Sequence, residues 1–170
     1  MPTFHVRVEK DFLVFSAGHF ITFNLDSCER LHGHNYRVAA EVAGLLDANQ
    51  YVIDFVWLRD AMKSLITELD HRMMLPTTHP RIRVTHDDRE VLATFADRRW
   101  IFPLGDCVLL PVSNTTSELV AEYLGNKLLA RIAAETQVQP IRVRIEVDEC
   151  FGQTAVWETC LADGGPISQE

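Results

Sequence analysis

The most informative stretch of this sequence is Cys28-Glu29-Arg30-Leu31-His32-Gly33-His34-Asn35-Tyr36. If the backbone is extended there, the His32 and His34 rings leave the same face of a strand. His19 ends an earlier β-rich run. Three neutral imidazoles on paired strands can hold a zinc ion and leave its fourth position open, as in catalytic zinc sites. The sequence therefore predicts a catalytic Zn2+ centre made by His19, His32 and His34.

Each member of this set also has an ordinary structural explanation. A single histidine on a strand is usually packed or solvated, so the zinc prediction depends on the three together. The glycine between His32 and His34 favours zinc, because it removes a side chain that would crowd the sheet. Cys28 is either a small buried hydrophobic residue or a thiol beside the metal with a lowered pKa.

Three further positions have both a structural and a functional interpretation. Asp70-His71 follows a predicted helix, and is either a helix C-terminus with a favourable cationic histidine or a carboxylate orienting an imidazole that activates Cys28. Glu149 ends a predicted strand, where it is either solvated or faces a pocket and accepts two N–H bonds from an aminopyrimidinone ring. Thr116 lies near a helix cap, with a ligand contact as the alternative.

The bulk composition describes a single globular domain. The chain has 170 residues, of which 47% are hydrophobic and 24% charged, enough for a sizeable core. A net charge of −8 argues against a nucleic-acid partner. No apolar run approaches the ~18 residues of a membrane span, and the N-terminus lacks signal-peptide features, so we expect a cytoplasmic protein with no membrane partner. The four cysteines form no CxxC pair and are expected to be free thiols.

Hydrophobic periodicity predicts the main elements. Strands are expected over 4–23, 36–42, 141–147 and 154–161. A first helix is expected after a cap at Asp54, with its apolar stripe formed by Phe55, Leu58, Met62, Leu65, Ile66 and Leu69. A second helix is expected to begin at Thr115-Thr116-Ser117-Glu118, a capping box in which Glu118 bonds back to the cap.

The order of these elements predicts an α+β domain with both helices on one face of the sheet. We expect a single domain over 1–162 and a flexible tail over 163–170. Within the domain, 76–111 is predicted to be an irregular β insertion with short strands at 82–84, 90–95 and 99–102.

Six segments together resemble the 6-pyruvoyl tetrahydropterin synthase family, which includes the 6-carboxytetrahydropterin synthases. The resemblance runs in order through nearly the whole chain, and the insertion at 76–111 fits it least well. The segments are Phe15-Ser16-Ala17-Gly18-His19, Cys28-x-x-x-His32-Gly33-His34-Asn35-Tyr36, Tyr51-Val52-Ile53-Asp54-Phe55, Leu69-Asp70-His71, Thr116-Ser117-Glu118 and Glu149-x-x-x-x-x-Ala155.

The resemblance implies the tunnelling fold, a four-stranded antiparallel sheet with two helices in the order ββααββ. It also implies trimers that close into a β-barrel, two of which stack into a homohexamer with active sites between subunits. In this chain His19, His32 and His34 would hold zinc, and Cys28 would be the proton-abstracting base. Asp70 with His71 would complete its relay, and Glu149 would anchor the pterin ring.

The implied reaction is that of a lyase acting on 7,8-dihydroneopterin triphosphate. Zinc would polarise hydroxyls of the substrate side chain, a thiolate would remove the acidified proton, and triphosphate would leave. The product is 6-pyruvoyl tetrahydropterin, or the 6-carboxy compound in members on the way to queuosine. The spacing Cys-x-x-x-His-Gly-His resembles the 6-carboxytetrahydropterin synthases.

Glu29 leaves a second reaction open. Other family members place a glutamate three residues before the first histidine of the pair, and these resemble enzymes that cleave the side chain to 6-hydroxymethyl-dihydropterin for folate. Glu29 is therefore either a solvated loop residue or a second base for aldolase-like cleavage, in a folate or methanopterin-type pathway. A non-catalytic pterin- or zinc-binding homologue is the alternative of another class.

Overall fold

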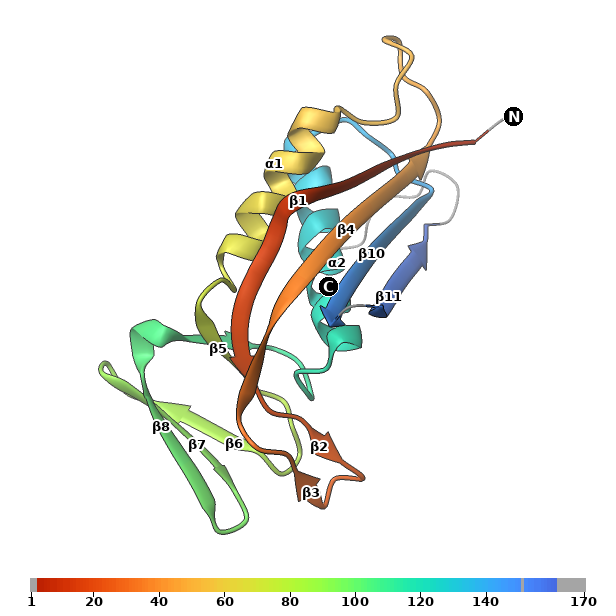
Figure 1. The fold of residues 1–170 in the computed structure, drawn as a ribbon. Coiled ribbons are helices and arrows are strands. Elements are labelled where there is room, and N and C mark those ends of the chain that lie inside the picture. The colour runs from red at the N-terminus through yellow and green to blue at the C-terminus, as the bar shows by residue number, and fades with distance from the viewer. Residues whose placement is uncertain (1–2, 151, 162–170) are drawn as a thin grey trace.

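A computed structural model of the chain describes residues 3–150 and 152–161. Figure 1 shows one long twisted sheet with α1 (Phe55–Thr67) and α2 (Ser117–Glu135) on the same face, and a smaller sheet beyond one end. The α+β arrangement with both helices on one face is confirmed. The predicted tail at 163–170 lies outside the described residues.

The large sheet has six strands in the order β11-β10-β4-β1-β5-β9. The predicted four antiparallel strands are its first four, and two short parallel strands, β5 and β9, extend it beyond β1. The strands are β1 (Phe4–His19), β4 (His32–Gly44), β5 (Arg72–Pro76), β9 (Cys107–Leu110), β10 (Arg142–Cys150) and β11 (Gln153–Cys160). The sheet is therefore larger than the sequence indicates, and mixed rather than purely antiparallel.

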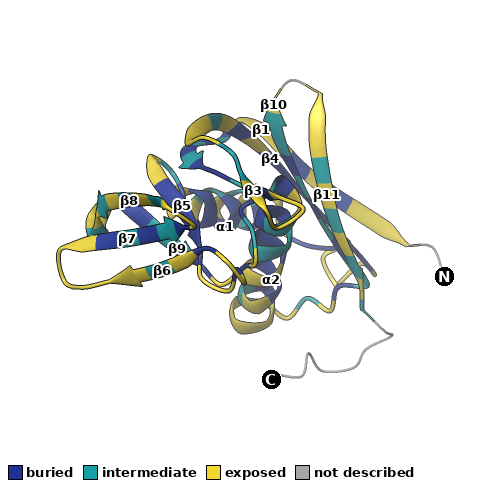
Figure 2. Ribbon diagram, turned by 90° about the horizontal axis from the view of Figure 1, so that it is seen from below, coloured by how far each residue is buried: buried dark blue, intermediate teal, exposed yellow. Residues whose placement is uncertain are grey.

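The central strand β4 explains how the sheet and helices form one core. Its alternate residues Tyr36, Val38, Ala40 and Val42 are buried on the helix-facing side. Ala39 and Ala43 on the other face are buried as well. Figure 2 shows buried positions gathered between the sheet and the helices. This face of β4 continues toward its N-terminus at His34 and His32, so the histidine pair extends the core stripe.

The first helix begins as the sequence predicts. Asp54 is its N-cap, and the carboxylate accepts hydrogen bonds from the backbone N–H groups of Val56 at 2.6 Å and Trp57 at 3.4 Å. The apolar stripe from Leu58 to Leu69 is buried. Phe55, in the first turn, is the exception, because it is 59% exposed.

The second helix also has a threonine cap, but it is not a capping box. Thr116 is the N-cap and its hydroxyl accepts from Leu119 N at 3.5 Å. The third helical position is therefore Leu119, and Glu118 lies one position too early to bond back to the cap. Thr115 instead uses its hydroxyl to donate to the Phe20 carbonyl at 3.1 Å, which ties the start of α2 to the end of β1.

The insertion forms the predicted short strands and a second hydrophobic core. Antiparallel strands β6 (Arg83–His86), β7 (Glu90–Phe95) and β8 (Arg98–Pro103) make the smaller sheet, and η1 (Leu104–Asp106) leads from it into β9. Its apolar side packs with Phe20, Met73 and Leu75. A short hairpin, β2 (Thr22–Phe23) with β3 (Ser27–Cys28), lies beside it in the connection from β1 to β4.

Gly125 is required where α2 packs against β11. A Cβ at this position would lie 2.2 Å from Cζ3 of Trp157. We expect Gly125→Ala to lower the free energy of unfolding, because overpacking costs ~1–3 kcal/mol against a gain in helix propensity of ~1 kcal/mol. Urea denaturation measures the difference. Gly105→Ala is the control, since a Cβ there has no neighbour within 4 Å, and an equal loss in both variants would contradict the packing explanation.

His79 makes stability depend on pH. Its Nδ1 accepts from Arg81 N at 2.9 Å and Ile82 N at 2.8 Å, and its Nε2 lies 2.8 Å from the Thr22 hydroxyl. Burial, with a smaller effect from Arg81, lowers the pKa of His79 below its ordinary 6.5. Below pH ~6.5 the unfolded chain therefore binds a proton that the folded chain does not, and stability falls as pH falls.

We therefore expect His79→Gln to cost ~1–3 kcal/mol at pH 7.5, where it leaves buried donors without their acceptor. That cost should shrink toward pH 5, because only the wild type loses stability through this group. Urea denaturation of both proteins at several pH values checks this. A difference that stays constant or grows on acidification would show that His79 does not titrate as described.

Candidate metal centre and active site

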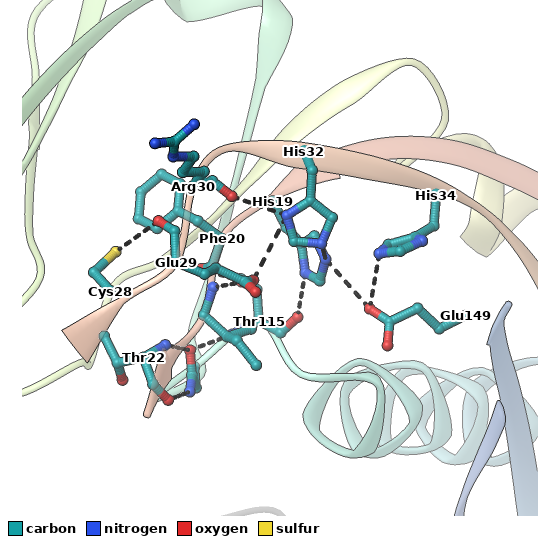
Figure 3. A network of polar contacts seen from close by, with 12 residues as sticks. His19, Phe20, Thr22, Cys28, Glu29, Arg30, His32, His34, Thr115 and Glu149 are labelled. Atoms are coloured by element: carbon teal, nitrogen blue, oxygen red, sulfur yellow. Dashed lines mark hydrogen bonds and ion pairs between the residues drawn. The ribbon is translucent and has the colours of Figure 1, made fainter. Parts of the chain in front are cut away.

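Three histidines converge at one end of the large sheet. The antiparallel register places His19 of β1 directly opposite His32 of β4, and His34 follows two residues later on the same face. The ligand atoms of all three lie within 4.8 Å of one another, so this cluster can hold a metal ion. Figure 3 shows the three side chains pointing toward a common point. The grouping predicted from the sequence is present in the structure.

Backbone carbonyls fix how two of these rings present their nitrogens. His19 Nδ1 lies 2.8 Å from the Thr115 carbonyl, and His32 Nδ1 lies 2.9 Å from the Arg30 carbonyl. A neutral imidazole that donates through Nδ1 has a lone pair on Nε2. The two Nε2 atoms are 3.2 Å apart, so two lone pairs face each other. Two nitrogen ligands of a tetrahedral zinc are about 3.3 Å apart, and the cluster therefore fits that ion.

The protonation state of His19 also suits a metal ligand. Its side chain is 1% exposed, and burial lowers the pKa of His19 while the Thr115 carbonyl acts in the opposite direction. The imidazole is therefore neutral at neutral pH, which is the form that coordinates metals. Hydrogen-bonded carbonyls behind the ligands hold ring orientation and tautomer. Thr115 belongs to the site for this reason, and the sequence carries no signal for it.

Gly33 is required by the close pairing of β1 with β4. A Cβ at Gly33 would lie 2.8 Å from the Ala17 carbonyl oxygen, on the backbone of the neighbouring strand. Gly18 lies directly opposite it in the register. The pair of glycines lets the two strands meet where they carry His19 and His32, in agreement with the crowding argument from the sequence.

Glu149 reaches the histidines from β10. Its Oε1 lies 3.2 Å from His19 Nε2 and 3.4 Å from His34 Nε2, and its side chain is half-buried. Tyr36 lies beneath them, with its ring edge-on to His19 and His34 and stacked on Phe15. Burial, followed by the charge of Glu149, raises the pKa of Tyr36. The strand end predicted for Glu149 thus faces the candidate site and not open solvent.

Glu29 joins the connection after β1 to the histidine cluster. Its Oε1 accepts a hydrogen bond from Ile21 N at 2.7 Å and lies 3.7 Å from His32 Nδ1. The side chain is 21% exposed. The alternative of a freely solvated loop residue is therefore wrong, and the carboxylate lies beside a candidate metal ligand.

Cys28 lies in the second hydrophobic core, at the edge of the site. Its thiol donates to the Glu29 carbonyl at 3.6 Å. Burial raises the pKa of the Cys28 thiol. The charge of Arg98 lowers this pKa, and the charge of Glu29 raises it. The groups of this chain therefore do not supply the lowered pKa that the sequence interpretation expects. Figure 3 shows Cys28 at one side of the network and the histidines at the other.

Asp70 and His71 form a pair at the edge of β1. Asp70 Oδ1 accepts from Ser16 N at 2.8 Å and lies 3.0 Å from His71 Nδ1. The Ser16 bond, more than His71, lowers the pKa of Asp70 against the effect of burial. The His71 side chain is 82% exposed, and its backbone φ is 57°. Within the described part of the chain, an ion pair links Asp70 to His71, and the Cys28 thiol bonds to the Glu29 carbonyl and to neither of these two residues.

Comparison with known proteins identifies the family. The model of the 6-pyruvoyl tetrahydropterin synthase family matches residues 7–159. The chain belongs to this family. A relative in Methanocaldococcus jannaschii, provisionally assigned as a 6-carboxy-5,6,7,8-tetrahydropterin synthase, is 28% identical over 150 residues, 88% of this chain and 91% of that protein. The 6-carboxy-5,6,7,8-tetrahydropterin synthase of Aquifex aeolicus is 27% identical over 125 residues, 72% and 73% of the two chains.

Solved structures of the family share the architecture. The crystal structure of 6-pyruvoyl tetrahydropterin synthase from Plasmodium vivax matches with a TM-score of 0.87 and 27% identity, covering 95% of this chain and 100% of that one. This confirms the tunnelling fold. A variant of that protein, in which a glutamate described as a catalytic residue is replaced by alanine, matches with a TM-score of 0.83 and 26% identity over the same shares. None of the described helices here combines the length and apolar character of a membrane span.

We expect His34→Ala to abolish metal binding, because it leaves two of the three imidazoles that make up the candidate site. Zinc content after dialysis should fall from about one per chain to a small fraction of that value. His86→Ala, an exposed histidine of β6, should keep its zinc and controls for the loss of an imidazole. Zinc retained by His34→Ala at the wild-type level would rule out the cluster as the metal site.

Proposed function

We propose that this protein is a zinc-dependent lyase acting on 7,8-dihydroneopterin triphosphate. Loss of triphosphate would give 6-pyruvoyl-tetrahydropterin, and loss of triphosphate together with a two-carbon fragment of the side chain would give 6-carboxy-tetrahydropterin. The observation that carries the proposal is the pair of Nε2 atoms of His19 and His32, turned toward each other by carbonyl hydrogen bonds. Membership of the synthase family supports the pterin substrate. The 6-carboxy product would place the protein on the route to queuosine.

The chain supplies the parts that this reaction needs. His19, His32 and His34 would hold zinc, which when bound polarises the hydroxyls of the substrate side chain. Glu149 is half-buried beside them, where its two oxygens can accept N–H bonds from the pterin ring and orient the side chain toward the histidines. Binding by a buried carboxylate favours a ring with adjacent donors. Thr116 serves as the helix cap, so a ligand contact from its side chain is not part of the proposal.

Cys28 is the proposed base for proton abstraction. Its thiol must lose a proton before it can accept one from carbon, and burial opposes this in the isolated chain. A nearby cation or imidazole would favour the thiolate. His71 is largely exposed, and it is available to a second copy of the chain. We therefore propose that the Asp70–His71 relay of one subunit serves Cys28 of another, in the hexamer that the family resemblance implies.

Glu29 supports a second candidate reaction, aldolase-like cleavage to 6-hydroxymethyl-dihydropterin. Its carboxylate lies 3.7 Å from His32 Nδ1, the ring nitrogen that does not face His19, and accepts a hydrogen bond from the Ile21 amide. Carboxylates are among the side chains that act as general bases in enzymes. A glutamate is also described as a catalytic residue of the P. vivax relative, which is a precedent for a glutamate with a catalytic role. The cleavage reaction would belong to a folate or methanopterin-type pathway.

Product analysis by mass spectrometry tests both candidates. We expect zinc-loaded wild type to release triphosphate from 7,8-dihydroneopterin triphosphate and form the pyruvoyl or carboxy product. Cys28→Ala should lower this rate by ~10²- to 10⁴-fold, the usual contribution of a general base, while zinc content and pterin binding persist. Cys160→Ala, an exposed cysteine of β11, should leave the rate unchanged.

Glu29→Gln separates the two reactions. A 6-hydroxymethyl product that forms from the triphosphate or from its dephosphorylated form, survives Cys28→Ala and disappears in Glu29→Gln would replace the synthase proposal by the cleavage reaction. No turnover of either substrate by zinc-loaded wild type would contradict both enzyme proposals and leave a pterin- or zinc-binding homologue.

A further inference from the structure

We propose that the small sheet β6–β7–β8 is a positioning platform for the segment 20–31, which carries Cys28 and Glu29, and that Arg98 is its positioning residue. The idea rests on the proposed function in one respect, because it takes Cys28 and Glu29 as the candidate bases. Four observations support it: the weakness of the segment itself, two arginine contacts, a shared aromatic core, and the place of Arg98 beside the thiol.

The segment 20–31 has little structure of its own. Its hairpin pairs only Thr22 with Cys28 and Phe23 with Ser27, and an isolated two-stranded hairpin is marginally stable in water. Asn24 and Leu25 at its tip have φ values of 50° and 63°, which are costly for residues with a side chain. A segment of this kind holds a reactive group in place only if another part of the chain supports it.

Two arginines from the insertion provide that support. Arg98 Nη1 donates to the Cys28 carbonyl at 2.6 Å, and Arg81 Nη1 donates to the Leu25 carbonyl at 2.7 Å and pairs with Asp26. Both contacts cross more than fifty positions of sequence and reach main-chain atoms of the hairpin. They therefore fix its backbone, whichever way its side chains turn.

Aromatic rings hold these guanidinium groups in place. Arg98 lies over the Trp100 ring at 4.6 Å, and Arg81 lies over Phe95 at 5.2 Å. Trp100 in turn stacks on Phe20, with ring centroids 4.4 Å apart. Phe20 directly follows the metal-ligand candidate His19. The platform thus contacts the segment near both of its ends, beside His19 and at Cys28. These contacts fix the position of Cys28 relative to His19.

Arg98 differs from an ordinary structural contact in its charge. Its guanidinium and the Glu29 carboxylate are the charged groups that act on the thiol, and they act in opposite directions. A cation held on the Cys28 backbone opposes the effect of burial on the thiolate. Removal of Arg98 should consequently affect both the order of the segment and the reactivity of its cysteine.

The test compares Arg98→Ala with Arg98→Lys and with Arg99→Ala, the exposed neighbour on the same strand. Hydrogen–deuterium exchange should become at least fivefold faster in peptides from 20–31 in Arg98→Ala and stay unchanged in Arg99→Ala. The pH of half-maximal Cys28 alkylation by iodoacetamide, followed by mass spectrometry, should rise in Arg98→Ala and return toward wild type in Arg98→Lys. Zinc content should persist throughout.

Activity adds a third measurement. Cys28-dependent turnover should fall at least tenfold in Arg98→Ala, in kcat more than in KM, with no change in Arg99→Ala. The platform proposal would be overturned if Arg98→Ala and Arg99→Ala had the same exchange rates over 20–31 and the same pH of half-maximal Cys28 alkylation. Wild type that turns over neither substrate would overturn the proposed function, while exchange and alkylation would still decide the role of Arg98. If Arg98→Ala fails to fold, Arg98→Gln takes its place in the same comparisons, because it removes the charge and keeps a polar side chain of similar length.

Discussion

The antiparallel pairing of His19 with His32 is the constraint on which the rest of the site depends. It brings two imidazoles together, and the carbonyls of Thr115 and Arg30 turn their Nε2 lone pairs toward each other across 3.2 Å. Such an arrangement is favourable when a cation is shared between them. Gly33 has no side chain, so the two strands can pair closely at this point and bring His19 and His32 together.

Two hydrophobic cores position different parts of the candidate site. The larger core between the sheet and the helices fixes the strand ends that carry the histidines, because Tyr36 and the buried residues after it continue the same face of β4. It also anchors the start of α2, which supplies the carbonyl behind His19. The smaller core beneath the insertion holds the segment with Cys28. Candidate metal ligands and candidate bases are thus positioned by different parts of the chain.

Local sequence patterns predicted most of the fold. Elements without a periodic hydrophobic pattern were not predicted. The long strands alternate and the helices carry caps and stripes, so their places follow from periodicity. β5 has buried residues in succession, Met73, Met74 and Leu75, and β9 has only four residues. Continuous short apolar runs do not distinguish a strand from buried loop or helix. The capping-box prediction was wrong because the first of two adjacent threonines bonds to the Phe20 carbonyl, just after β1, rather than to the helix.

The sequence by itself determined that His32 and His34 share a face, because residues two apart on a strand do so whatever the strand packs against. It also determined the helix-facing core stripe for the same reason. The register of β1 with β4 brings His19 to His32 and His34. Tertiary structure alone decided the tautomers of His19 and His32 and the contact of Glu149 with the histidines. It also decided the exposure of His71 and the hydrogen bond from Arg98 to the Cys28 carbonyl. Most of these features depend on contacts between residues far apart in the chain. The exposure of His71 depends on how the whole chain packs. Neither kind of feature produces a periodic pattern in the sequence.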